Sequence, residues 1–168
     1  VRDRADEKLE YCKRRYGWGE LCVKYTEPDD GTPEDTESFA EDFAKDIGQW
    51  PDLIVIDYAD RITWKGAKAD SSDYIVQGKV WQAYDILAKR RGRECVVATA
   101  SQAKELQKGQ QWLNHKNMAD SKRKARYLSV GASINWNSTR TEGGLHIFKG
   151  RKGLPVGRTL PIKPNWPY

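Results

Sequence analysis

Residues 53–58 read Leu-Ile-Val-Ile-Asp-Tyr, and this apolar run with a carboxylate at its end decides the fold class. The run does not alternate between apolar and polar side chains, which is typical of a strand that helices cover on both faces. A second such run lies at residues 94–100, and a helix is predicted before it, with Val80 and Leu87 on its inner face. Strand, helix and strand in this order predict an α/β fold with a mostly parallel sheet flanked by helices.

Further elements are predicted on both sides of this unit. Upstream, Thr32, Pro33 and Asp35 form the pattern of a capped helix start, and Gly48 ends that helix. The other predicted elements are a charged helix at 3–16, a short strand at 21–25 and three β-like pieces at 133–136, 145–148 and 158–162. The polar and basic stretch at 103–126 has no predicted element. No repeat or linker divides the chain, so one domain is predicted.

Charge is distributed unevenly along the chain, whose net charge is +5. Residues 1–60 hold 8 Lys and Arg against 17 Asp and Glu, whereas residues 61–168 hold 21 against 7. A basic second part suits a polyanionic partner. Alternatively, the two parts neutralise each other across the fold, and composition leaves both interpretations open.

Cysteine usage and hydropathy narrow the class of protein. The three cysteines are scattered and form no CxxC pair, so neither a disulfide framework nor a cysteine metal site is expected. No apolar run approaches the roughly 18 residues that span a bilayer. These features predict a cytoplasmic protein without a membrane partner.

Two polar side chains follow the predicted strands. Asp57 ends the first, and Gln102 comes after Ser101 at the end of the second, so both are expected at the carboxyl edge of the sheet. A carboxylate there can hold Mg²⁺ through water, and an amide can contact a terminal phosphate. Taken singly, Asp57 could equally cap the next segment, and Gln102 could simply begin a polar loop.

Two basic stretches are candidates for binding anions. Lys149 and Arg151 lie in a glycine-rich turn after a predicted strand, where cations can stabilise a transferring phosphoryl group, or where they form a solvated hairpin tip. Residues 104–126 combine many cations with Trp112 and His115, a mixture that suits single-stranded nucleic acid. A solvated charged loop is the alternative for that stretch.

Taken together, these motifs resemble the motor domain of DnaB-type replicative helicases, over about residues 20–163. The strand ending in Asp57-Tyr58, the strand ending in Ser101-Gln102 and the Lys-x-Arg-x-Gly turn at 149–153 follow one another in that family's order. The resemblance implies a RecA-like ATPase fold with β-hairpin pieces near the C-terminus. It further implies a hexameric, phage-type helicase of DNA replication that couples ATP hydrolysis to movement along single-stranded DNA.

The resemblance also implies roles for individual residues. Asp57 corresponds to the Walker B carboxylate for Mg²⁺, and Gln102 to the sensor of the γ-phosphate. Lys149 and Arg151 correspond to the finger pair that completes the ATP site of a neighbouring subunit. The DNA-facing loop corresponds to the stretch that holds Lys122, Arg123, Lys124 and Arg126.

The sequence departs from the family pattern in two ways. Ala59-Asp60 stands where the family commonly has Leu-Gln after the Walker B tyrosine, and no GxxxxGK[ST] phosphate-binding loop occurs anywhere. We therefore expect residues 1–168 to be a partial RecA-like domain whose phosphate-binding unit precedes Val1. Alone, it should be inactive and should not bind ATP or Mg²⁺ tightly. The alternatives are a RecA-like nucleic-acid-binding module that naturally lacks this loop, and another RecA-superfamily ATPase such as a recombinase.

Overall fold

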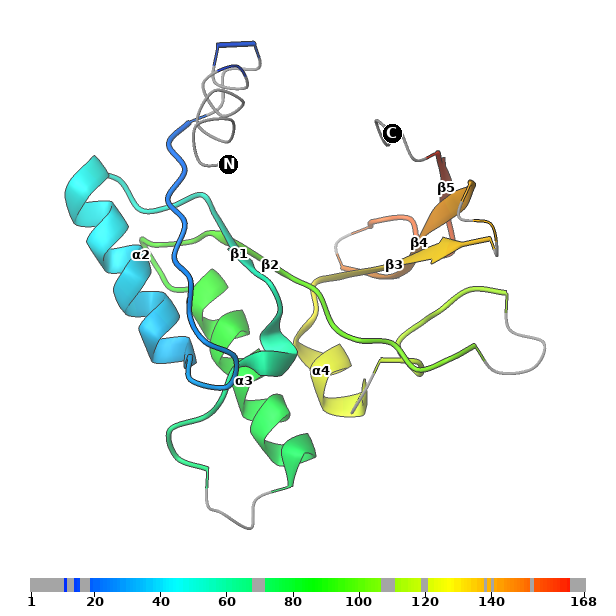
Figure 1. The fold of residues 1–168 in the computed structure, drawn as a ribbon, viewed down its shortest axis with the longest axis horizontal. Helices are drawn as coiled ribbons and strands as arrows, with labels where there is room; N and C mark the ends of the chain where they lie inside the picture. Colours follow the sequence, from blue (N-terminus) through cyan, green and yellow to red (C-terminus); the bar gives the residue numbers. More distant parts are fainter. Residues whose placement is uncertain are drawn as a thin grey trace.

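The chain folds into helices packed beside two small sheets, as the computed structural model in Figure 1 shows. The structure describes residues 11, 14–15, 19–67, 72–106, 111–118, 121–137, 139, 141–151 and 153–163. The helices are α2 (Pro33–Ile47), α3 (Asp73–Ala88), α4 (Ser121–Tyr127) and the 3₁₀ turn η1 (Ala59–Arg61). The strands are β1 (Leu53–Ile56), β2 (Val96–Thr99), β3 (Val130–Trp136), β4 (Gly143–Gly150) and β5 (Thr159–Ile162). The charged helix predicted at 3–16 lies almost entirely outside the described residues.

The two sheets differ in strand direction. β1 pairs with β2 in parallel, with Leu53 opposite Val96 and Ile56 opposite Thr99. β3, β4 and β5 form an antiparallel sheet in that order, which confirms the three predicted β-like pieces. The α/β class is therefore confirmed, although parallel pairing within the described residues is confined to β1 and β2.

Helix α2 begins as its sequence predicts. The Thr32 hydroxyl accepts from the Asp35 backbone N–H at 3.2 Å, and the Asp35 carboxylate accepts from the Thr32 backbone N–H at 3.0 Å. These reciprocal bonds satisfy two N–H groups that a helix start leaves without partners. Hydrogen bonding to Thr32, followed by the nearby charge of Lys65, lowers the pKa of Asp35. Gly48 ends the helix in the left-handed conformation, at φ 78°.

The main core lies between α3 and one face of β1 and β2. Ile56 packs with buried side chains of α3, including Val80, Trp81 and Leu87, so the predicted inner face of this helix is confirmed. The opposite face of the two strands is open. Leu53 is 54% exposed, as the neighbouring side chains Val55 and Val96 also are at 68% and 62%.

Three sequence predictions need correction. The expected cover on both faces of β1 is absent among the described residues, as the exposed Val55 shows. Residues 21–25 form no strand, because no neighbouring strand in the described part of the chain pairs with them, and Val23 is 82% exposed. The stretch predicted to lack structure contains α4, which packs against α3 and so gains the tertiary contacts that stabilise a short helix.

Candidate functional site

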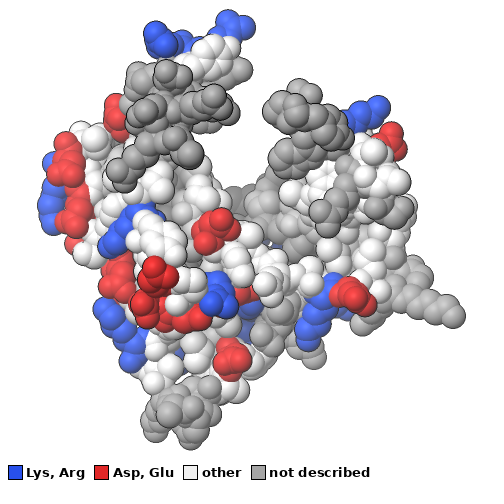
Figure 2. All heavy atoms as spheres, viewed as in Figure 1, with Lys and Arg blue, Asp and Glu red and all other residues white. Residues whose placement is uncertain are grey.

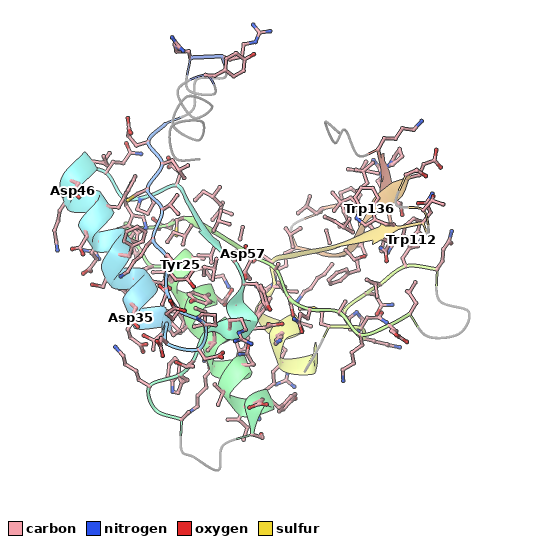
Figure 3. The ribbon with its side chains drawn as sticks, in the orientation of Figure 1. Tyr25, Asp35, Asp46, Asp57, Trp112 and Trp136 are labelled. Carbon is pink, nitrogen blue, oxygen red and sulfur yellow. The ribbon has the colours of Figure 1, made fainter. Side chains whose placement is uncertain are left out.

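The loop after β1 presents Asp57 at the carboxyl edge of the parallel sheet, as labelled in Figure 3. The Thr99 hydroxyl at the end of β2 donates to the Ile56 carbonyl and accepts from the Ala59 backbone N–H, both at 2.9 Å. These bonds tie the loop after β1 to the neighbouring strand. Asp57 itself is exposed, and none of the other described residues forms a hydrogen bond or ion pair with its carboxylate.

Gln102 lies at the same edge, past the end of β2. Its side-chain amide donates to the Tyr58 hydroxyl at 3.2 Å, and its backbone N–H donates to the Asp60 carboxylate at 3.0 Å. The loops after the two strands are therefore in direct contact, and Gln102 touches the residue that follows Asp57. The expected meeting of these two side chains at one sheet edge has this geometric basis.

A buried ion pair stands behind this edge, and sequence reasoning missed it. The Lys124 ammonium of α4 lies 2.7 Å from the Asp60 carboxylate, and the two side chains are 1% and 13% exposed. The second carboxylate oxygen of Asp60 accepts from the Ser101 hydroxyl at 2.8 Å. The available signal was the departure at Ala59-Asp60, which places a carboxylate where the resembling family has an amide.

The position of Lys124 corrects its predicted role in nucleic-acid binding. A side chain that is 1% exposed and paired with a carboxylate does not reach a phosphate in solvent. Arg123 and Arg126 remain exposed on the same helix, and the side chain of Lys122 lies outside the described part. The Arg123 guanidinium lies 5.0 Å from the ring centroid of Tyr74, a cation–π distance that leaves the charge at the surface.

Lys149 and Arg151 lie against the last turn of α4. The Lys149 ammonium donates to the Ala125 carbonyl, and the Arg151 guanidinium donates to the Arg126 carbonyl at 2.8 Å. Cations suit this position because the last carbonyls of a helix lack partners and carry partial negative charge. Burial, and then the neighbouring charge of Arg151, lower the pKa of Lys149. Within the described residues, no hydrogen bond or ion pair joins this pair to Asp57.

Part of the charge asymmetry is neutralised inside the fold. Figure 2 shows the acidic side chains of the visible face gathered mainly on the side that α2 occupies. Arg93, beyond the end of α3, lies 2.8 Å from Glu41 of α2, and Arg90 pairs with Glu37 in the same way. The basic groups near α4 and β4 do not take part in these pairs, so both interpretations of the charge pattern hold in part.

Two kinds of site are absent from the described part of the chain. No group of three or more His, Cys, Asp or Glu side chains comes together there to hold a metal ion. None of its helices has the length and apolar character needed to traverse a lipid bilayer.

Comparisons with known proteins identify the fold. No family model matches the sequence, and no curated protein matches it either. One solved ATPase domain is similar in structure, with a TM-score of 0.62 and 18% identity, over 79% of this chain and 48% of that one. A DnaB-like replicative helicase, whose interactions with primase are known, has a TM-score of 0.62 and 17% identity, over 79% of this chain and 33% of its own. The chain thus has the fold of DnaB-like helicase ATPase domains and spans half or less of these proteins.

Proposed function

We propose that this chain supplies the metal-holding, phosphate-sensing and finger residues of a DnaB-like helicase motor, which couples ATP hydrolysis to movement along single-stranded DNA. One observation carries the proposal. Exposed Asp57 and exposed Gln102 follow adjacent parallel strands, and their loops touch through Tyr58, within a fold similar to the ATPase domains of such helicases. Ligands of open α/β sheets bind at this edge.

The chemistry of Asp57 fits a magnesium ion that arrives with nucleotide. Mg²⁺ usually keeps several waters and binds through one or two carboxylates together with substrate phosphates. One exposed carboxylate that no other described residue engages matches that requirement, whereas both oxygens of Asp60 are already occupied by protein donors. Bound with ATP, the ion would neutralise charge on the β- and γ-phosphates. Asp57 would orient a metal-bound water.

Gln102 has the freedom that a phosphate sensor needs. Its backbone is held by Asp60, while its side-chain amide donates to the Tyr58 hydroxyl. A neutral amide can exchange that partner for a phosphate oxygen without moving the backbone. Gln102 would in this way report the presence of the γ-phosphate to the loop after β1.

Lys149 and Arg151 are suited to an anion brought by a neighbouring subunit. The two cations lie close enough for Arg151 to lower the pKa of Lys149, so an added phosphate would relieve their repulsion. We propose that they act across the interface of a homohexameric ring, on charge that develops during phosphoryl transfer.

The phosphate-wrapping loop of this motor would come from another segment. No GxxxxGK[ST] occurs in the sequence, and backbone amides of such a loop are what cradle phosphates. The open face of β1 and β2 offers that segment a place to pack, because Leu53, Val55 and Val96 form an apolar surface there. We propose that a loop-bearing strand and helix cover this face in the intact motor.

Calorimetry of the chain with Mg²⁺ and a non-hydrolysable ATP analogue is expected to show no site in the micromolar range. The reason is that one carboxylate and one amide replace few of the hydrogen bonds that triphosphate makes with water. Asp57→Asn is the matched control and should leave the flat isotherm unchanged. A tight isotherm with one analogue per chain would show that the chain holds a complete nucleotide site and would contradict the proposed division of the motor.

Single-stranded DNA is expected to bind the chain weakly, with an affinity that falls steeply as salt rises. Each phosphate contact contributes about 0.7 to the slope of log affinity against log salt for single strands. Replacing exposed Arg123 and Arg126 with Ala should therefore lower the slope by about 1.4. Arg91→Ala, which removes an exposed cation beyond the opposite end of α3, is the control and should change the slope little. Equal slopes for all three proteins would place DNA elsewhere or nowhere on this chain.

A further inference from the structure

The Asp60 carboxylate joins three segments that are distant in sequence. One oxygen accepts from the Lys124 ammonium at 2.7 Å. The other accepts from the Ser101 hydroxyl at 2.8 Å and from the Gln102 backbone N–H at 3.0 Å. Both oxygens therefore face protein donors, and the side chain is 13% exposed. Asp60 thus fixes the backbone at Gln102 and anchors α4 through one side chain.

Lys124 is held on several sides. Its ammonium lies 3.5 Å from the Ser101 hydroxyl and 5.8 Å from the ring centroid of Trp81 in α3, in addition to its contact with Asp60. A buried ammonium tolerates displacement poorly, because any other position leaves a desolvated charge without compensation. The position of α4 along α3 is therefore tied to the loop after β1.

The opposite side of α4 holds the basic pair. The two residues that follow Lys124 are Ala125 and Arg126, and their carbonyls accept from Lys149 and Arg151. The Arg151 backbone N–H also donates to the Ser129 carbonyl at 3.0 Å, just beyond the helix. A shift of α4 would consequently move the acceptors that position both cations.

We propose that Asp60 and Lys124 are positioning residues that couple Gln102 at the sheet edge to Arg151 through α4. The pair lies at the position where the chain departs from the pattern of the helicases it resembles, so this link is a property of this chain. The functional meaning of the coupling depends on the roles proposed above for Gln102 and Arg151. The physical link does not, because it exists without nucleotide.

A paired substitution separates positioning from folding. In Asp60→Asn, the amide oxygen can replace the carboxylate oxygen that accepts from Ser101 and Gln102, and the amide nitrogen then faces residue 124. Combining it with Lys124→Met removes both charges, so no buried ion is left without a partner. The double variant should keep Gln102 in place while α4 loses its anchor. Glu41→Gln with Arg93→Met removes the surface pair between α2 and the end of α3 and is the matched control.

Amide hydrogen exchange of the 168-residue chain without nucleotide reads the coupling directly. In the double variant, exchange at Arg151 and along α4 should rise by about tenfold or more, while exchange at Gln102 stays within about threefold of the parent. The control variant should change neither. Unchanged protection at Arg151 would overturn the proposal. Uniformly faster exchange, or failure of the double variant to fold, would also overturn it, because the pair would then serve the core as a whole. Lys124→Arg, which keeps the charge, should retain most of the protection at Arg151.

Discussion

Replacing Arg151 with Ala, in a protein that joins this chain to a phosphate-binding loop, is expected to lower ATP turnover by about a thousandfold or more, the range of arginine fingers. Its guanidinium is exposed and would meet the nucleotide only as charge develops during transfer, so folding and nucleotide affinity should change little. The measurement is kcat at saturating Mg²⁺ and ATP. Arg158→Ala, which removes an exposed cation from the neighbouring turn, is the control and should retain near-parental turnover.

Mixed assemblies test whether Arg151 acts across an interface. A subunit with a disabled phosphate-binding loop but an intact Arg151 should restore part of the turnover of the Arg151→Ala protein, because some interfaces then combine both working parts. Parental turnover by Arg151→Ala alone would instead show a solvated hairpin tip, whose removal costs well under about 1 kcal/mol.

Lys124→Met is expected to destabilise the chain by about 3–5 kcal/mol, because it leaves the Asp60 carboxylate buried without its cation. Urea denaturation at neutral pH measures this loss as a lower transition midpoint at similar slope. Lys89→Met breaks an ion pair whose lysine is half exposed and should cost no more than about 1 kcal/mol. Equal losses in the two variants would show that the Lys124 pair is worth no more than a surface contact.

Local patterns predicted those parts of the fold that local chemistry determines. The cap of α2 depends on residues within three positions of one another, so Thr32 and Asp35 could be recognised from the sequence. The meeting of Asp57 and Gln102 at one edge follows from strand direction, because parallel strands end at the same side of a sheet. Neither prediction needed knowledge of distant contacts.

The features that sequence reasoning missed depend on contacts between distant segments. Residues 21–25 have strand composition, but a strand forms only beside a partner, and composition does not reveal whether one is present. Lys124 lies among other cations in sequence, so it looked like a solvated, DNA-facing residue. Its burial arises from Asp60, 64 residues earlier in the chain, and from the packing of α4 on α3.

The position of the metal ion tests the central claim most directly. The measurement is a crystal structure of the loop-bearing protein with Mn²⁺ in place of Mg²⁺ and a non-hydrolysable ATP analogue, in which the metal is located by its anomalous signal. The account predicts a metal within about 5 Å of the Asp57 carboxylate, the reach of one bound water. It also predicts the Gln102 amide within hydrogen-bond distance of the γ-phosphate. A metal and nucleotide bound more than about 8 Å from Asp57, beyond the reach of a metal-bound water, would contradict the account.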